Sequence, residues 1–138
     1  TTSTLLKGGS EQFNCTFRSA EFYLTAAEAA ARLGQRTEAI GYLEQLAQKR
    51  YNATAYATFQ SNIASLTDDQ LVEEIVNERA RELAFEGHRW FDLRRTTMPA
   101  LTKTYNGETF QLNANDSRYT MRFPTGAVEA NPNISLWP

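Results

Sequence analysis

One stretch of sequence, TDDQLVEEIVNERARELAFEGHRWFDLRR at residues 67–95, constrains the fold of this chain more than any other. Thr67 followed by Gln70 has the form of a capping box, with acidic residues in the turn between them, where a helix N-terminus favours negative charge. The stretch ends on basic residues, which suit the C-terminal end of the helix dipole. Apolar residues recur at helical steps of three and four: Val72, Ile75, Val76, Leu83, Trp90 and Phe91. The pattern predicts one long helix over residues 67–95.

Four charged residues with the same spacing lie beside this apolar stripe, and we call them the charged row: Arg79, Glu82, Glu86 and Arg89. Large apolar residues crowd the same two turns, so we expect the row to be partly buried, where a charge must be paired and hydrogen-bonded. Because a guanidinium group can bind a carboxylate or loop carbonyls, the expected partners are the ends of other elements. Gly87 in mid-helix costs about 1 kcal/mol relative to Ala, which predicts a close backbone approach or a stacked aromatic ring there.

The string ERARELAFEGHRWFDLRR at residues 78–95 resembles the signature near the C-terminus of the SusD/RagB family of bacterial outer-membrane nutrient-binding lipoproteins. Two further strings are similar to family motifs in the same order: FRSAEFYLTAAEAAARLG at residues 17–34 and PTGAVEANPN at residues 124–133. The chain departs from the family pattern at residues 134–138. Within the signature, the resemblance implies that these residues form a structural motif: Arg79, Glu82, Glu86, Gly87, Arg89, Trp90 and Asp92.

The resemblance implies a function as well as a fold. Family members bind a glycan or another nutrient without catalysis at the outer-membrane surface and deliver it to a SusC-like TonB-dependent transporter. They are much longer than 138 residues, so this chain is expected to be the C-terminal portion of such a protein and mainly scaffold. Ligand contacts in the family come largely from regions outside the matched segment, so the resemblance assigns no ligand-binding residue here. The anchoring lipid is expected outside this chain.

Composition is consistent with one globular domain over residues 1–138. The net charge of −2 and the absence of a basic patch argue against nucleic acid as a partner. No apolar run is long enough to span a membrane. The N-terminus shows neither an initiator Met nor an apolar signal core, so we expect a segment of a longer protein that begins with an extended lead-in over residues 1–16. The lone Cys15 is expected to be a buried or partly buried side chain.

Residues 17–95 are predicted to be mainly helical. A helix is expected over residues 19–33, with an inner side formed by Phe22, Tyr23, Ala26, Ala27, Ala30 and Leu33, and Gly34 follows as its C′ residue. A second helix is expected over residues 38–51. Together, these two expected helices predict an αα-hairpin similar to a tetratricopeptide unit, although an ordinary helical hairpin fits the residues equally well. Residues 52–66 show no clear period and predict a loop with at most a short helical turn.

Residues 96–138 predict an irregular segment. Asn106-Gly107 between residues 102–105 and 109–112 predicts a short β-hairpin. Prolines at positions 124, 132 and 138 argue against helix over the tail. An extended tail must satisfy its backbone groups, so we expect it to lie over the helices and to be held by the charged row. The fold class is therefore mainly α, with one αα-hairpin, one long helix and an irregular C-terminal segment.

Candidate chemistry is sparse. Glu86 and His88 lie roughly 200° apart around a helix, so only His88 and Asp92 share a face, and we expect no metal site. Glu82 and Glu86 could form an acid–base pair for glycoside hydrolysis, but neighbouring arginines would keep both ionised. No nucleophile elbow, phosphate-binding loop, dinucleotide fingerprint or zinc motif is present, so neither catalysis nor a cofactor is predicted.

Three classes of function therefore remain open. The resemblance favours nutrient binding; a helical-repeat adaptor for protein partners and a hydrolase that depends on Glu82 or Glu86 are the alternatives. Trp137, Tyr105 and Tyr119 are aromatic residues of the irregular segment that could contact a sugar. We interpret them instead as anchors of the tail.

Overall fold

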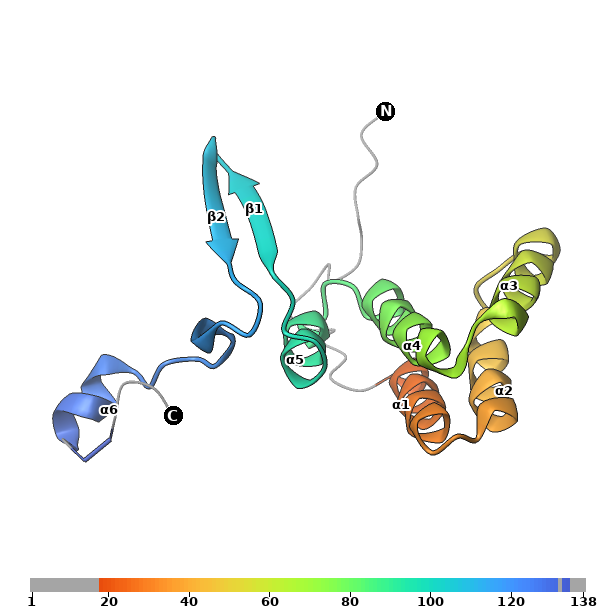
Figure 1. The fold of residues 1–138 in the computed structure, drawn as a ribbon, viewed down its shortest axis with the longest axis horizontal. Helices are drawn as coiled ribbons and strands as arrows, with labels where there is room; N and C mark the ends of the chain where they lie inside the picture. The colour runs from red at the N-terminus through yellow and green to blue at the C-terminus, as the bar shows by residue number, and fades with distance from the viewer. Residues whose placement is uncertain (1–17, 132, 135–138) are drawn as a thin grey trace. The chain divides into compact units, whose positions relative to one another are not determined.

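The computed structural model describes residues 18–131, 133 and 134, which are mainly helical, as predicted (Figure 1). Cys15, Trp137 and the predicted lead-in over residues 1–16 lie outside the described residues. The helices are α1 Ser19–Arg32, α2 Arg36–Ala47, α3 Ala53–Ser65, α4 Asp68–Glu82, α5 His88–Arg95 and α6 Thr125–Ala130. Strands β1 Leu101–Tyr105 and β2 Glu108–Leu112 form one antiparallel pair.

The chain divides into two compact units, Thr1–Arg89 and Trp90–Pro138. The first contains α1 to α4, and the second contains the β-hairpin and α6. Helix α5 begins at the end of the first unit and continues into the second. That the 138 residues make up a single domain stays a prediction.

The predicted αα-hairpin is present in the first unit. Helices α1 and α2 pack against each other, α4 packs on α1, and α3 contacts α2. Gly34 has φ +74° and ends α1, in the left-handed conformation expected of a C′ glycine. The core lies between these helices and is formed by Ala20, Leu24, Ala27, Ala30, Ala31, Ala39, Leu43, Leu46, Ile63, Leu71 and Ile75. Small side chains on α1 let its neighbours approach closely.

The inner side of α1 differs from the predicted one. Phe22 and Leu33 are 62% and 75% exposed, and Tyr23 is also exposed, whereas Leu24 is fully buried. The buried stripe therefore runs through Leu24, Ala27 and Ala31 and excludes the larger side chains that we placed inside. The reason is steric, because close packing of α1 on both α2 and α4 favours alanine over an aromatic ring at the shared face.

Helix α4 begins as predicted. Thr67 Oγ1 accepts a hydrogen bond from the Gln70 backbone N–H, and the Gln70 side chain accepts one from the Thr67 N–H, which completes the capping box. The buried stripe includes Ile75 and Val76, as expected, and also Leu71, which we had not placed there.

The prediction of one long helix over residues 67–95 is wrong. Helix α4 ends at Glu82, residues 83–87 form a turn, and α5 begins at His88. Phe85 has φ +66° and Gly87 has φ +84°, values outside any right-handed helix. Phe91, which lies beyond this turn, is exposed and does not continue the predicted buried stripe.

The turn also corrects our interpretation of Gly87. A Cβ atom built at Gly87 would meet nothing within 4 Å, so neither a close backbone nor a stacked ring requires glycine there. Glycine is favoured at position 87 because the backbone there has a positive φ.

Gly87→Ala is therefore expected to lower the free energy of unfolding by about 1 kcal/mol, since alanine is strained at positive φ. Gly41→Ala is the matched control, because Gly41 lies within helix α2 and its site is equally open. It is expected to raise the stability by about 0.5–1 kcal/mol. Urea denaturation followed by circular dichroism measures both. Equal effects of the same sign would contradict the assignment of strain to the 83–87 turn.

Residues 52–66 form helix α3 instead of the predicted loop. The Asn52 side chain caps its N-terminus by accepting a hydrogen bond from the Ala55 N–H at 2.9 Å. Ile63 is its one fully buried residue among those described, and Phe59 packs at the edge of the core beside Tyr51. The helix buries so few side chains that its sequence carries no clear apolar period.

The β-hairpin of the second unit is confirmed. Asn106 and Gly107 have φ +49° and +81°, as a two-residue type I′ turn requires, and Tyr105 pairs with Glu108 across it. At the open end the Asn115 N–H donates to the Met98 carbonyl at 2.9 Å.

The tail contains a helix, contrary to the prediction. Helix α6 begins directly after Pro124, where a proline is compatible with the first turn because no helical N–H is lost. Residues 117–119, within the segment predicted to be irregular, form a 3₁₀ turn, and Asp116 Oδ1 caps it by accepting a hydrogen bond from the Arg118 N–H at 2.9 Å.

Candidate functional site

Two residues of the charged row, Glu82 and Glu86, belong to an ion-pair network that joins the ends of three helices. Glu82, at the C-terminus of α4, accepts hydrogen bonds from Arg50 Nε at 2.9 Å, from Arg50 Nη2 at 2.8 Å and from Arg18 Nη1 at 2.9 Å. Arg18 is the residue before α1, and Arg50 follows α2. The Glu82 side chain is only 9% exposed. Its carboxylate is therefore the common acceptor of two arginines from different helix ends.

Arg18 also binds the turn that follows α4. Its Nη2 donates to the Glu82 main-chain carbonyl at 2.8 Å, and its Nε donates to Glu86 Oε2 at 3.0 Å. A guanidinium with this fork of donors pairs with two carboxylates at once and caps an orphan carbonyl at the helix end. The network thus fixes where α4 stops and where the 83–87 turn begins.

The network keeps Glu82 ionised. The hydrogen bonds from Arg50 lower the pKa of the Glu82 carboxyl, and those from Arg18 lower it further, which outweighs the opposing effect of burial. A general acid needs a raised pKa instead. The geometry at Glu82 therefore suits a structural anion and does not suit proton donation to a glycosidic oxygen.

The expected partly buried ion pairs of Glu82 and Glu86 are thus present, and they reach the ends of other elements. Sequence reasoning did not identify Arg18 or Arg50 as the partners. Each lies next to a predicted helix end, which is the one local signal that could have singled them out. That the charged row also holds the C-terminal segment stays a prediction.

The other two members of the row behave differently from Glu82 and Glu86. Arg79 is buried in α4 and its Nη1 donates to Thr25 Oγ1 of α1 at 3.1 Å. Arg89 lies exposed in α5, beyond the turn. The four residues therefore do not form one continuous helical row, because the turn at residues 83–87 interrupts it.

Trp90 and Asp92, two residues of the predicted motif, lie in α5. Asp92 is buried and its Oδ1 accepts from Arg95 Nε at 3.0 Å and Nη2 at 2.7 Å, within the same helix. Trp90 stacks on Tyr119, with ring centroids 4.9 Å apart. His88 Nδ1 lies 3.7 Å from Glu21 Oε1 of α1. Among residues 18–131, 133 and 134, no three His, Cys, Asp or Glu side chains converge as metal ligands.

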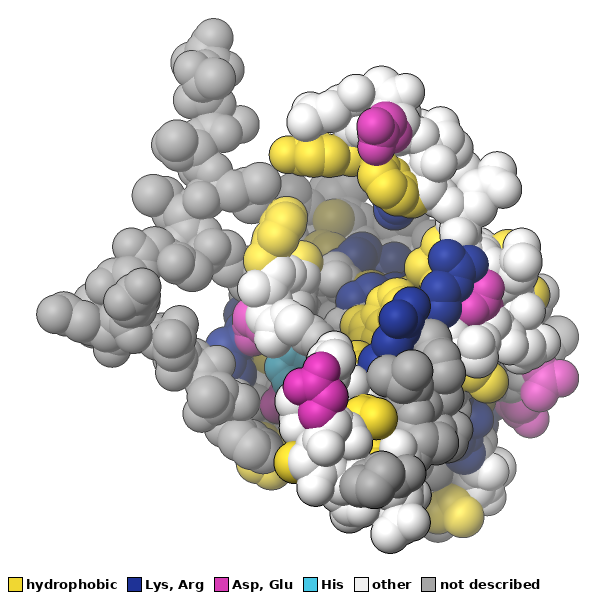
Figure 2. All heavy atoms as spheres, turned by 90° about the vertical axis from the view of Figure 1, so that its left-hand side faces the viewer, with side chains coloured by type: hydrophobic (Ala, Val, Ile, Leu, Met, Phe, Trp, Pro, Cys, Tyr) yellow, Lys and Arg dark blue, Asp and Glu magenta, His cyan; other side chains and the backbone are white. Residues whose placement is uncertain are grey.

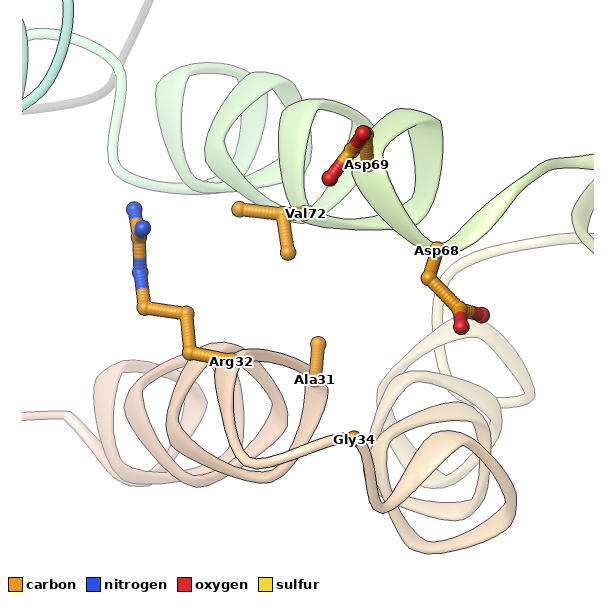
Figure 3. Close-up of a pocket in the computed structure, with 6 residues that line it drawn as sticks. All are labelled: Ala31, Arg32, Gly34, Asp68, Asp69 and Val72. Atoms are coloured by element: carbon orange, nitrogen blue, oxygen red, sulfur yellow. The ribbon is translucent and has the colours of Figure 1, made fainter.

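An open groove lies between the C-terminal end of α1 and the N-terminal end of α4 (Figure 3). It has a volume of about 460 Å³ and is lined by Ala31, Arg32, Gly34, Asp68, Asp69 and Val72. Two of its three charged side chains form ion pairs: Arg32 pairs with Glu28 on α1, and Asp68 pairs with Arg36 on α2. Arg36 also donates to the Leu66 carbonyl at 2.7 Å, so these charges hold the α2, α3 and α4 ends together.

The aromatic residues of the second unit separate into anchors and exposed rings. Tyr119 is 1% exposed, and its hydroxyl donates to the Pro99 carbonyl at 2.6 Å, as expected of an anchor. Tyr105 is 71% exposed on β1, and Phe110 is 55% exposed on β2. Some hydrophobic side chains reach the surface on the side drawn in Figure 2. Tyr105 and Phe110 are therefore the accessible aromatic pair of the hairpin.

Within the part of the chain that the structure describes, no helix is both long enough and apolar enough to cross a bilayer.

Comparison with known proteins identifies the class to which this mainly helical chain belongs. The model of the SusD family matches residues 2–138. The chain is 40% identical to SusD-like protein P38 of Formosa agariphila over 81 residues, which are 58% of this chain and 16% of that protein. It is 32% identical to SusD-like protein P2 of the same organism over 120 residues, which are 85% of this chain and 24% of that protein. The chain belongs to the SusD family, as its three motifs predicted, and it spans at most a quarter of the length of these curated relatives.

Proposed function

We propose that this chain is the scaffold portion of a protein that binds a glycan or another nutrient without cleaving it. The protein would act at the bacterial outer-membrane surface as a lipoprotein, and it would pass its ligand to a SusC-like TonB-dependent transporter. The observation that carries this proposal is the match of the SusD family model to residues 2–138.

The ion-pair network supports the scaffold role. Glu82 and Glu86, the two carboxylates that a hydrolase would use, both bind Arg18, and Glu82 binds Arg50 as well. Carboxylates held by arginines in this way position helix ends and are poorly suited to acid–base catalysis. The hydrolase alternative therefore has no support in the geometry of these residues.

The proposal is tested by a glycan-binding panel. Affinity electrophoresis with soluble starch, xylan, galactomannan and alginate is run on this chain and on a full-length SusD-family protein that contains it. We expect retardation of the full-length protein by at least one polysaccharide, with no new reducing ends after incubation. A second arm asks whether a SusC-like transporter co-purifies with the full-length protein in detergent.

Other outcomes would favour the alternatives. Release of reducing ends that disappears in Glu82→Gln or Glu86→Gln would establish the hydrolase. Absence of binding to every polysaccharide, together with capture of a protein partner through the helices, would favour the helical-repeat adaptor.

A further inference from the structure

We propose that one face of the β1–β2 hairpin, the face that carries Tyr105 and Phe110, is a contact surface for a carbohydrate chain. This inference rests on the proposed function and assigns it a site within residues 101–112.

The register of the hairpin separates its side chains into two unlike faces. Paired residues share a face and alternate residues change face, so Tyr105 and its partner Glu108 lie on the same side as Phe110 and its partner Lys103. Leu101 opposite Leu112 continues this face at the base of the hairpin. The other face carries only Thr102, Thr104, Thr109 and Gln111. We call the first of these the aromatic face.

The two rings of the aromatic face are diagonal neighbours on adjacent strands. Residues in such positions lie about 7–8 Å apart, near enough for one ligand to touch both. Their exposure of 71% and 55% is unusual for aromatic side chains so close together. A ligand that covered the rings would therefore remove a large apolar area from water.

The hairpin is held at its base while its aromatic face stays accessible. A two-stranded hairpin is marginally stable alone, so contacts beyond the strands must support it. Arg118 Nη2 donates to the Gln111 carbonyl at 3.1 Å, and the same guanidinium forms an ion pair with Asp116 at 2.7 Å. The Asn115 N–H donates to the Met98 carbonyl. These bonds involve neither ring, so they order the strands without covering the aromatic face.

The charges on the aromatic face favour a sugar over a protein surface. Lys103 lies directly across from Phe110, and Glu108 lies directly across from Tyr105, so each ring has a charged hydrogen-bonding group beside it. The centre of a protein interface is depleted in Lys and Glu, because both would have to be desolvated there. A sugar has an apolar face of C–H groups to stack on a ring and hydroxyls at its edge that accept from an ammonium and donate to a carboxylate.

The test compares two double variants of the full chain in the same affinity electrophoresis. Tyr105→Ala/Phe110→Ala removes both rings, and Thr104→Ala/Thr109→Ala is the matched control on the opposite face, where the two hydroxyls lie 3.4 Å apart. Far-ultraviolet circular dichroism verifies that both variants fold as the wild type does. We expect the aromatic variant to bind the retarding polysaccharide about tenfold more weakly or worse, and the threonine variant to bind like the wild type.

Each other outcome overturns the inference. If both variants bind like the wild type, or if both weaken equally, the aromatic face is not the site, although glycan binding by the family member stands. If no polysaccharide retards this chain while the full-length protein is retarded, the site lies elsewhere in that protein. If neither is retarded, the proposed function fails together with this inference. If removal of the rings instead converts a dimer to a monomer in light scattering, with unchanged glycan binding, the face is an interface between copies.

Discussion

Glu82→Ala is expected to lower the free energy of unfolding by about 2–4 kcal/mol, because Arg18 and Arg50 lose their common acceptor. The Glu82 side chain is 9% exposed, so its bonds to the two guanidinium groups lie largely out of water in the folded protein. Arg50 is 43% exposed and Arg18 26%, and solvation of the freed arginines keeps the loss below that of a fully buried pair. Urea denaturation followed by circular dichroism at 222 nm measures the change.

Glu73→Ala is the control for this variant. Glu73 lies exposed on the same helix, so its removal is expected to change the stability by less than about 0.5 kcal/mol. A similar loss in both variants would show that the Glu82 effect is one of helix propensity or net charge. Arg50→Ala combined with Glu82→Ala in a double-mutant cycle then isolates the pair itself.

The Glu82 carboxylate is expected to make the protein less stable as the pH falls. The arginines lower the pKa of Glu82 in the folded state below its ordinary value of 4.5. Its contribution is therefore fully present above that pH and is lost as the pH falls through the folded-state pKa. As the pH falls below about 4.5, the wild type is expected to lose more stability than Glu82→Gln, which cannot take up that proton. If the free energy of unfolding of the wild type and of Glu82→Gln changed in parallel with pH, this role of the ion pairs would be contradicted.

Tyr119→Ala is expected to destabilise the Trp90–Pro138 unit by about 3–5 kcal/mol, enough to disorder its packing. Tyr119 is 1% exposed, stacks on Trp90 and donates to the Pro99 carbonyl. Removal of the ring therefore leaves a cavity beside Trp90 and an unsatisfied carbonyl. Trp90 is one of two tryptophans in the chain, so its fluorescence in a Trp137→Phe background reports on this unit during urea denaturation.

Two further variants separate the contributions of Tyr119. Tyr119→Phe keeps the stacked ring and loses only the hydroxyl bond, at an expected cost of about 1 kcal/mol. Tyr105→Ala removes an exposed ring from the same unit and is expected to change its stability by less than about 0.5 kcal/mol. If Tyr119→Ala leaves the Trp90 emission and its denaturation midpoint unchanged, Tyr119 does not anchor this segment.

Features formed by residues close together in the chain could be predicted from the sequence. The Thr67–Gln70 capping box joins groups three residues apart, and the Asn106-Gly107 turn needs only positive φ values that these residues accept readily. The αα-hairpin follows in the same way from two amphipathic segments and the C′ glycine Gly34. The resemblance of three short motifs was sufficient to find the family.

Two helices, α3 and α6, were not predicted although each has a local sequence signal at its N-terminus. The lack of an apolar period in residues 52–66 concealed α3, although Asn52 is a good N-cap residue. Prolines in the tail were taken to exclude helix, although Pro124 stands where a helix tolerates it.

Tertiary packing sets where helix α4 stops and which groups pair with its charged side chains. The apolar spacing of residues 67–95 continues through the turn, and its local sign, Gly87, was attributed to a close packing contact instead of a positive φ. Arg18 and Arg50 reach Glu82 across 64 and 32 residues, and any of several arginines could have done so as far as the sequence shows. Helix caps and turns are set by bonds within one turn of chain, whereas ion pairs and exposed faces depend on how whole helices pack, and spacing along the chain does not encode that packing.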